Sequence, residues 1–550
     1  MRAKKDVHIT DRRSESVMRR LDLKKAKPSK RKFIIIQIDS LPYSILERFL
    51  HRGSCKFINR LIKKEGYHLQ RFNCGLPSGT PSVQSGIMYG DNSMIPGFRF
   101  VDKKKKQQFS FGNPNHAKYI ESTFFAGKKG ILEGGASYAN HFSGGAQRSI
   151  FTMSTITKSK NFRRIRESSL WLFLFLHPAS LWRVLYYSVA ELLIESVEIM
   201  THPFLRLLGK RKAIFGFRLP FRRLLMNVIL AEIITLGAVI DIKRKVPRIY
   251  LNYMSYDDIA HLRGPHSTSA FFMVRALDRR IKRIVRKTKD DDYDIFIISD
   301  HGQVDSVPFR AVNGMTLAEF IEKCAHVESF GLTSANEGRL SLIGVLMKKT
   351  LGFLNYVSAP LRWAGSSFAR GMLKVIKPQQ YRFVWDEDER IFVADSCSLA
   401  HVYFSISNER MDLHQVNRKY PLLIEKLLRN RSIGMVMAQQ GDRIMLMHGR
   451  GMVIIGKDFV RKQGRDFLQE YGDEETLISQ LRDFNSLKFV GDLVLFGSYK
   501  DGVAVSFTEH VGSHGGIGGD MMYPFFISKK KYNLSKVTNA RELHRIFKEY

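Results

Sequence analysis

Continuous apolar runs that end in aspartate recur along the chain and predict buried parallel strands. Residues 33–38 read FIIIQI before Asp39, and the same pattern recurs at 248–257 and 293–302. Runs without alternation are typical of strands that are buried on both faces. Residues 269–289, between the last two runs, have helical periodicity and a basic last turn. Strand, helix and strand in this order predict a doubly wound, mostly parallel α/β sheet with acidic side chains at one edge.

Five shorter apolar runs follow in the last third of the chain. They lie near 401–406, 433–438, 443–447, 492–496 and 502–507, and the last leads into a glycine-rich segment around His514. Their length and composition are typical of strands. We expect them to complete the same central sheet.

Two long stretches interrupt this pattern and are predicted to be helical, basic and apolar insertions. Residues 101–246 begin with a lysine run and a glycine-rich segment, and residues 311–385 are apolar, aromatic and basic. The core would then comprise three segments: residues 33–100, residues 247–310, which hold two of the predicted parallel strands, and residues 386–550, which hold His514. Residues 1–32 are rich in Lys and Arg, which predicts a disordered arm that is either a solubilising tail or a segment bound to an acidic surface.

Composition and charge limit the class of protein, its partners and its cellular compartment. The chain has 550 residues, of which 44% are apolar and 25% charged, as in globular proteins. Its net charge of +36 favours polyanionic partners, such as an anionic membrane surface, nucleic acid or phosphorylated substrates. The four cysteines show no framework spacing, and the N-terminus lacks the apolar region of a signal peptide. We therefore expect a cytoplasmic protein, peripheral on the inner face of the cell membrane.

One apolar segment, residues 224–241, is close to the minimum length for a membrane span. Glu232 lies near its middle, which would cost about 3 kcal/mol in a bilayer. A second crossing would be needed to keep the core on one side, and the other apolar segment, 168–190, is broken by His177, Pro178 and Arg183. Two alternatives remain open: helices that lie in the membrane interface, and helices that pack on the domain itself.

Carboxylates and imidazoles follow the predicted strand ends in a set that suits two metal ions. Three carboxylates and three imidazoles can hold two divalent cations about 4 Å apart, and a hydroxyl between the cations becomes a nucleophile. Ser78 and Ser82 flank the candidate hydroxyl of Thr80 as rivals. The candidate ligands are Asp39, Thr80, Asp257, His261, Asp300, His301 and His514.

Three motifs connect these residues to a known family. Thr80 is followed after ten residues by Gly90 and after seven more by Gly97; residues 257–265 read DDIAHLRGP; and residues 299–302 read SDHG. The chain resembles the type I phosphodiesterase/nucleotide pyrophosphatase family of the alkaline phosphatase superfamily. The resemblance covers about 33–100, 247–310 and the remaining core to about 527. Ala260 departs from it, because the family has glycine at that position.

The resemblance implies a nucleophile and a division of the ligands between two metals. Thr80 would be the nucleophile. One metal would be held by Asp257, His261 and His514, and the other by Asp39, Thr80, Asp300 and His301. Zinc suits this mixture of imidazole and carboxylate, and manganese is the alternative. For the asparagine that contacts the phosphate in many members there is no clear match, and Asn92 and Arg99 are the weak substrate-binding candidates.

The expected activity is metal-dependent hydrolysis of a phosphoester. The substrate would be a nucleotide or a lipid-linked phosphoester, and we expect the reaction to take place at a membrane surface. A phosphomutase or a phosphoglycerol-type transferase on the same core is an alternative within enzymes. A non-catalytic basic protein that tethers membranes is a third reading, but it leaves the ligand set unexplained. The chain shows no signature of a nucleic-acid-binding module.

Overall fold

The computed structural model describes residues 31–156, 178–207, 219–289, 291–332, 385 and 389–550. The predicted arm, apart from its last two residues, lies outside this range. So do residues 333–384, which are most of the second predicted insertion.

A mixed seven-stranded sheet forms the centre of the protein and confirms the predicted α/β class. The three predicted parallel strands are neighbours, with β1 between β7 and β8 and parallel to both. One edge is closed by antiparallel strands and the other by two short parallel strands. The strand order is β2 (His68–Arg71), β21 (Phe525–Ser528), β8 (Tyr293–Ile298), β1 (Lys32–Ile38), β7 (Arg248–Tyr253), β5 (Ala136–Tyr138) and β6 (Arg148–Ile150).

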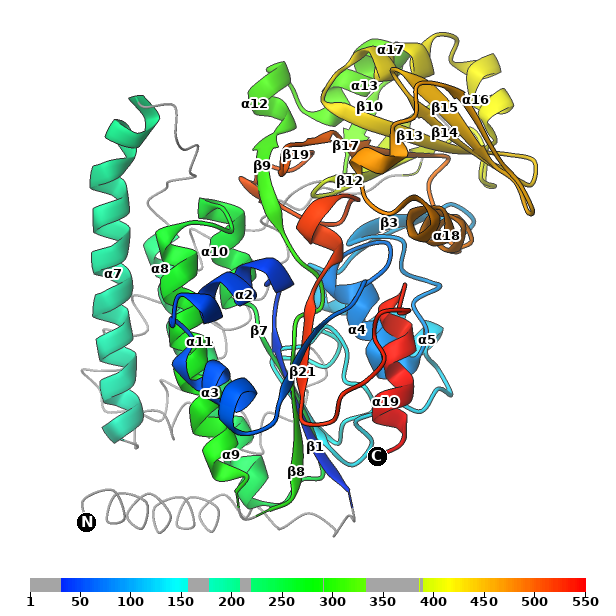
Figure 1. The fold of residues 1–550 in the computed structure, drawn as a ribbon. Helices are drawn as coiled ribbons and strands as arrows, with labels where there is room; N and C mark the ends of the chain where they lie inside the picture. Colours follow the sequence, from blue (N-terminus) through cyan, green and yellow to red (C-terminus); the bar gives the residue numbers. More distant parts are fainter. Residues whose placement is uncertain (1–30, 157–177, 208–218, 290, 333–384, 386–388) are drawn as a thin grey trace, which may run out of the picture.

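Helices cover both faces of this sheet (Figure 1). On one side lie α2 (Tyr43–His51), α3 (Lys56–Lys64), α9 (Ala231–Lys243) and α11 (Thr268–Lys287). On the other lie α4 (Thr80–Tyr89), α5 (Pro114–Phe124) and α19 (His544–Lys548). The predicted helix after β7 is confirmed as α11: Ser267 caps it by accepting from the Ala270 amide, and Met273, Leu277 and Ile281 are buried on its inner face.

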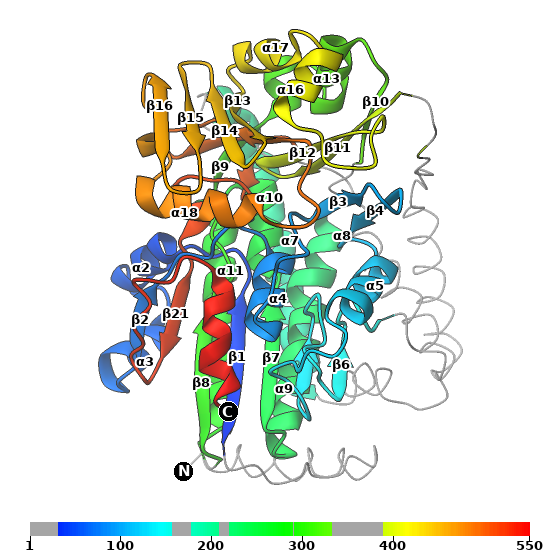
Figure 2. The same cartoon turned by 90° about the vertical axis from the view of Figure 1, so that its right-hand side faces the viewer.

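A second sheet stands above the central one (Figure 2), and it corrects one prediction. The strands expected near 401–406, 433–438, 443–447 and 492–496 exist, but they do not complete the central sheet. They pair antiparallel with one another, and helices α13 (Leu317–Ala325), α16 (Leu413–Lys419), α17 (Leu423–Arg429) and α18 (Glu474–Asn485) cover them in two separate apolar clusters. The order is β10 (Ser329–Gly331), β11 (Ile391–Ser396), β12 (Leu399–Phe404), β17 (Leu493–Gly497), β13 (Ile433–Gln440), β14 (Arg443–His448), β15 (Gly451–Ile455) and β16 (Val460–Gly464).

A small four-stranded sheet connects the two larger ones. It contains β18 (Tyr499–Lys500), β19 (Val503–Ser506), β9 (Val304–Pro308) and β20 (Gly512–Ser513). The strand predicted near 502–507 is therefore β19, in this sheet. Because β20 pairs antiparallel with β9, the residues that follow β20 lie beside the residues that precede β9. A hairpin of β3 (Arg99–Asp102) and β4 (Gln107–Ser110) lies nearby.

The range 101–246 contributes to the core as well as to the helical layer. Strands β5 and β6 belong to the central sheet, and the later part forms α7 (Pro178–Leu207), α8 (Leu219–Arg223), the π-helix η1 (Leu224–Leu230) and α9. By length and composition, residues 224–243 could cross a membrane. However, 89% of the apolar 18-residue window within this segment is buried inside the structure. Glu232 within it is paired with Arg183 at 3.0 Å and with Arg283 at 2.7 Å. For this segment the alternative of packing on the domain is the one observed.

Candidate active site

The candidate ligands converge at the edge of the central sheet where β1, β7 and β8 end. Asp39 follows β1, and Asp300 and His301 follow β8. Asp257 and His261 lie one turn apart on α10 (Ser255–Arg263), which follows β7. Because the three strands are parallel neighbours, these side chains meet at one edge. Thr80 is the first residue of α4, and His514 follows β20 directly.

The first group of ligands is Asp257, His261 and His514. His261 Nε2 lies 3.0 Å from Asp257 Oδ1 and 3.2 Å from His514 Nε2, and His514 Nε2 lies 3.7 Å from Asp257 Oδ1. Zinc–ligand bonds of about 2.0–2.1 Å at tetrahedral angles place ligand atoms about 3.3 Å apart. The three atoms are therefore close to the positions that one zinc ion requires, and they form a group that could hold a metal ion.

The second group surrounds the Thr80 hydroxyl. Thr80 Oγ1 lies 3.1 Å from Asp39 Oδ1 and 3.2 Å from His301 Nε2. His301 Nε2 in turn lies 3.4 Å from Asp300 Oδ2 and 3.8 Å from Asp39 Oδ1. Asp39, Asp300 and His301 form a second group that could hold a metal ion, and Thr80 is in direct contact with it.

Backbone carbonyls orient all three imidazoles. His261 Nδ1 lies 2.7 Å from the Gly512 carbonyl oxygen, His301 Nδ1 lies 3.0 Å from that of Gly302, and His514 Nδ1 lies 3.0 Å from that of Ser78. A carbonyl only accepts, so each Nδ1 donates and each Nε2 keeps its lone pair for a metal. Burial, followed by the charges of His301 and His261, lowers the pKa of His514 well below its ordinary value, which keeps this ligand neutral.

The carboxylates of the site repel one another in the absence of cations. Burial, followed by the nearby charges of Asp300 and Asp257, raises the pKa of Asp39 well above its ordinary value. Asp300 Oδ2 is buried and accepts no hydrogen bond from the part of the chain that the structure describes. A buried carboxylate oxygen without a donor is costly unless a cation faces it. The donor set, its spacing and its excess of negative charge all fit two divalent ions.

Close backbone approach explains two glycines of the motifs. The φ of Gly302 is not positive, so its backbone conformation does not by itself require glycine. A Cβ at Gly302 would lie 1.8 Å from the carbonyl oxygen of Asp520, so no other residue fits there. A Cβ at Gly512 would lie 2.3 Å from the carbonyl oxygen of Ala260, on the helix that carries two ligands. These contacts hold the His301 and His514 segments against the core.

The two weak substrate-binding candidates have other partners. Asn92 is buried and donates to Ser82 Oγ at 3.2 Å and to Asn539 Oδ1 at 3.1 Å, and it does not line the cavity above Thr80. Arg99 does line that cavity, and its Nη1 lies 3.1 Å from Asp395 Oδ1. The positive charge at this wall is thus already paired with a carboxylate.

The structure adds residues that sequence reasoning missed. Asn252 Nδ2 donates to Asp39 Oδ2 at 2.8 Å, and the signal for it was a polar residue within the buried run of β7. Cys397 and His510 also line the cavity, and no sequence motif indicated that they would.

Replacing Asn252 by alanine should lower metal affinity and turnover by about 10–100-fold, as is typical when a group that orients a metal ligand is lost. The reason is that Asp39 would lose its 2.8 Å donor and with it a fixed orientation. Metal titration of the stripped variant, followed by the activity at each metal concentration, measures the effect. Asn92→Ala is a matched control, because Asn92 is equally buried and touches none of the candidate ligands in the hydrogen bonds described. Equal metal affinity in Asn252→Ala and wild type would contradict the orienting role.

A cavity of about 140 Å³ opens above Thr80. Besides the candidate ligands, apolar side chains from several elements form its walls. Met226 comes from η1, so the helical layer takes part in the lining. The main apolar residues are Phe98, Phe111, Met153, Met226, Met254 and Leu399.

A comparison with curated protein sequences gives no match. Among solved structures, the chain is similar to phosphonoacetate hydrolase from Sinorhizobium meliloti 1021, with 11% identity, a TM-score of 0.46, and coverage of 95% of this chain and 96% of the other. It is also similar to murine ectonucleotide pyrophosphatase/phosphodiesterase 5, with 10% identity, a TM-score of 0.46, and coverage of 94% of each chain.

The decisive comparison is with protein families. The model of the type I phosphodiesterase/nucleotide pyrophosphatase family matches residues 33–348, more than half of the chain. This range contains all the candidate ligands except His514, which the fold brings to the others. The protein is therefore a phosphoester hydrolase that belongs to the type I phosphodiesterase/nucleotide pyrophosphatase family.

Proposed function

We propose that the protein hydrolyses a phosphodiester with Thr80 as nucleophile and two divalent metal ions as cofactors. The observation that carries this proposal is the position of Thr80 Oγ1, 3.1 Å from Asp39 and 3.2 Å from His301, inside a cluster of carboxylates and imidazoles. A hydroxyl that only capped a helix would not need a buried carboxylate and a buried imidazole in contact with it.

The chain's residues divide between the two ions as the geometry groups them. Asp257, His261 and His514 would hold one ion, and Asp39, Asp300, His301 and Thr80 the other. When bound, the ions would lower the pKa of the Thr80 hydroxyl and stabilise negative charge on the phosphoryl group. The imidazole-rich set favours zinc, with manganese as the alternative.

Thr80 performs the bond exchange. Its Oγ forms a bond to phosphorus while the bond from phosphorus to the leaving oxygen breaks, and the leaving alcohol takes a proton from solvent. Water then attacks the phosphothreonine from the opposite side, which releases a phosphomonoester and restores the hydroxyl. Because Thr80 opens α4, the positive end of the helix dipole faces the phosphoryl oxygens.

The test is metal-restored hydrolysis of a chromogenic phosphodiester and of the matching monoester. Protein stripped with EDTA is refilled with zinc or manganese, and release of the chromophore into water is followed. Turnover that returns with metal and favours the diester supports the proposal. Turnover that requires an added alcohol acceptor would instead establish a transferase, and preference for the monoester would reject the diesterase.

The cavity supports an amphiphilic substrate. Phenylalanine and methionine side chains dominate the wall beside Thr80, and the one arginine among the lining residues, Arg99, is ion-paired with Asp395. Apolar walls favour burial of an apolar leaving group over a highly charged one. We infer a lipid-linked or similarly amphiphilic phosphoester, with a nucleotide as the alternative.

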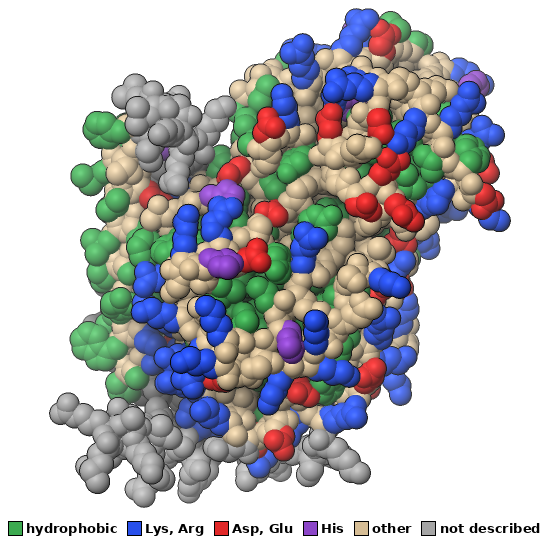
Figure 3. Space-filling model, viewed as in Figure 1, with side chains coloured by type: hydrophobic (Ala, Val, Ile, Leu, Met, Phe, Trp, Pro, Cys, Tyr) green, Lys and Arg blue, Asp and Glu red, His purple; other side chains and the backbone are tan. Residues whose placement is uncertain are grey.

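Helix α7 supports action at a membrane surface. Its outer side exposes large apolar side chains at helical spacing, seen as the row of hydrophobic atoms at the left of Figure 3. Its inner side carries Glu195 and Glu198, which pair with Arg263 at 2.6 Å and 3.0 Å. The helix is thus held by ion pairs to α10, while its apolar side has no cover among the described residues. The exposed side chains are Trp182, Leu185, Tyr186, Val189, Leu192, Leu193, Val197, Ile199, Met200 and Phe204.

Charge favours an anionic bilayer as the occupant of this surface. In the sequence, residues 158–166 before α7 and 206–218 at and after its end each hold five Lys or Arg and no Asp or Glu. Apolar side chains flanked by basic clusters are typical of helices that lie in the interface of anionic membranes. Two copies that met through α7 would bring these like charges together, on top of a net charge of +36 each.

Liposome flotation tests the docking surface. Wild type should float with vesicles that contain anionic phosphatidylglycerol, and less with neutral phosphatidylcholine or at high salt. Leu193→Glu combined with Met200→Glu should reduce the bound fraction by about tenfold, because two charges would enter the apolar region. Leu422→Glu is the matched control, since Leu422 is 61% exposed and Leu193 62%. Unchanged flotation of the double variant, or a dimer that only this variant disrupts, would overturn the proposal.

A further inference from the structure

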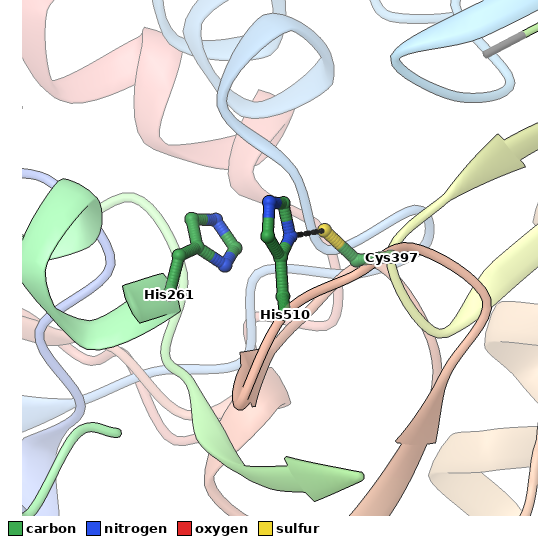
Figure 4. Close-up of side chains that lie close together, drawn as sticks. All are labelled: His261, Cys397 and His510. Atoms are coloured by element: carbon green, nitrogen blue, oxygen red, sulfur yellow. Dashed lines mark hydrogen bonds between the residues drawn. The ribbon is translucent and has the colours of Figure 1, made fainter. Parts of the chain in front are cut away.

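A third group of metal-ligating side chains adjoins the active site, and the proposed reaction uses only one of its members. His261, Cys397 and His510 each offer a ligand atom, and these atoms lie within 4.8 Å of one another. Figure 4 shows the His510 ring between His261 and Cys397, with the Cys397 sulfur facing His510 Nδ1. Cys397 lies in the turn between β11 and β12 in the second sheet, whereas His261 lies on α10 beside the central sheet.

The spacing within this group suits a thiolate-containing zinc site. Cys397 Sγ lies 3.6 Å from His510 Nδ1. Zinc–sulfur bonds of about 2.3 Å and zinc–nitrogen bonds of about 2.0–2.1 Å at tetrahedral angles place the two atoms about 3.5–3.6 Å apart. The His510 ring lies against the His261 ring, with centroids 4.1 Å apart. One cysteine and two histidines, with a fourth position open to the cavity, form a three-ligand set that suits zinc.

Backbone hydrogen bonds hold the group in place. The Cys397 carbonyl accepts from the Phe507 amide at 2.7 Å, and the His261 carbonyl accepts from the Val511 amide at 3.0 Å. The backbone φ of Cys397 is +62°, a value that residues other than Gly and Asn rarely adopt. His510 Nδ1 also lies 3.0 Å from Thr508 Oγ1, but that hydroxyl has Ser506 Oγ as a second partner at 2.9 Å. Thr508 can therefore turn away when an ion arrives.

His261 cannot serve both sites at once. Its Nδ1 lies 2.7 Å from the Gly512 carbonyl, which leaves Nε2 as the ligand atom. One nitrogen lone pair binds one metal ion. An ion that takes His261 together with Cys397 and His510 thus removes it from the set of Asp257 and His514, which would keep two of its three ligands.

We propose that His261, Cys397 and His510 form an inhibitory site for a thiophilic divalent cation such as zinc or cadmium. Thiolate ligands select soft metals, whereas the Asp39 and Asp257 groups accept harder ones such as manganese. Occupation of the inhibitory site should lower phosphodiesterase turnover by taking His261. The effect on turnover rests on the proposed function, but the binding of the ion does not.

The binding test uses cobalt as a spectroscopic substitute for zinc in the full-length protein stripped of metal. Thiolate bound to cobalt gives a charge-transfer absorption in the near ultraviolet, which carboxylate and imidazole ligands do not give. We expect this band in wild type and in the control Cys324→Ser, but not in Cys397→Ser. Cys324 is a matched control because it is buried on α13 and does not line the cavity. A band that survives in Cys397→Ser, or no band in wild type, would overturn the site.

A further variant separates competition from simple binding. Asp257→Asn weakens the rival site, so His261 should be released and the band should appear at about tenfold lower cobalt, equivalent to 1.4 kcal/mol. If Asp257→Asn instead abolishes the band, the three side chains do not bind independently of the catalytic group, and the proposal fails. Because absorption is the readout, this result is obtained whether or not the protein hydrolyses a phosphodiester.

Inhibition is measured as a ratio within each protein. Turnover with two equivalents of zinc is divided by turnover with excess zinc, and the same ratio is taken with manganese. The turnover of wild type should fall about tenfold in excess zinc and change little in excess manganese. The turnover of Cys397→Ser should change little in an excess of either metal. Equal zinc inhibition in wild type and Cys397→Ser would show that the inhibitory ion binds elsewhere.

Discussion

Replacing Thr80 by alanine is expected to lower phosphodiesterase turnover by about 10³-fold or more while both metal ions remain bound. The loss follows because the alanine side chain has no oxygen to form the bond to phosphorus. The metals should remain because each group keeps three ligands without Thr80. Metal content is measured on the purified variant, and turnover is measured with the same chromogenic diester as in wild type.

Serine substitutions sharpen this test. Thr80→Ser retains a hydroxyl at the same position, so most of the turnover should remain. Ser82→Ala is a control for the neighbouring hydroxyl. In the hydrogen bonds described, Ser82 Oγ accepts from Asn92, whereas Thr80 Oγ1 contacts Asp39 and His301. Near-wild-type turnover in Thr80→Ala would reject the nucleophile. Loss of metal in the same variant would mean that Thr80 acts mainly as a ligand.

The strands and ligands that could be predicted carry local signals that agree with one another. β1, β7 and β8 are almost entirely buried, so their sequences are mainly apolar, and each is followed by a polar ligand or by the helix that carries one. Neighbouring parallel strands end at the same edge of a sheet. The pairing of β1 with β8 is therefore enough to predict that Asp39, Asp300 and His301 lie close together.

The second sheet could not be predicted from the sequence, because the sequence of a strand does not determine which other strand it pairs with. β12, β13 and β14 are apolar enough to be central strands, but hairpin neighbours pair antiparallel with one another and build a separate core. β5 and β6 were missed for the opposite reason: each has three residues, within a glycine-rich stretch.

The apolar helices show where composition stops being informative. The segment from Leu224 to Lys243 and helix α7 both read as apolar, yet the first is buried in the core and the second exposes its apolar side. Pro178 was read as a break, but it begins α7, where proline at the first turn costs no hydrogen bond. The difference between the two helices depends on ion pairs such as Glu232–Arg283 and Glu195–Arg263, whose partners are distant in sequence.

Replacing Asp39 by asparagine is expected to have opposite effects on activity and on the stability of the metal-free protein. Turnover should fall by more than about 100-fold, beyond the usual cost of losing a residue that merely orients a ligand. Asp39 belongs to one ion-binding group, and its Oδ1 also contacts Thr80 at 3.1 Å. An amide in its place binds a divalent ion far more weakly than a carboxylate.

In EDTA, the same variant should be more stable than wild type at neutral pH. Burial, Asp300 and Asp257 raise the pKa of Asp39 in the folded metal-free protein above the unfolded value of about 3.9. Because the folded-state pKa is raised, the free energy of unfolding of metal-free wild type falls once the pH rises above the unfolded-state pKa. It continues to fall until the pH reaches the folded-state pKa. The Tm of Asp39→Asn should therefore exceed that of wild type by a few degrees at pH 7 and approach it near pH 4.

Metal should reverse this order, because the cations that remove the repulsion bind wild type and not the variant. Thermal unfolding with EDTA and with zinc, each at both pH values, gives the four comparisons. Asp292→Asn controls for the loss of one negative charge, since the exposed Asp292 lies in the turn just before β8, at the opposite end of the strand from Asp300. A metal-free Asp39→Asn protein that unfolds at or below the wild-type temperature at pH 7 would show that the three carboxylates do not strain the empty site, and the main electrostatic argument for two cations would fail.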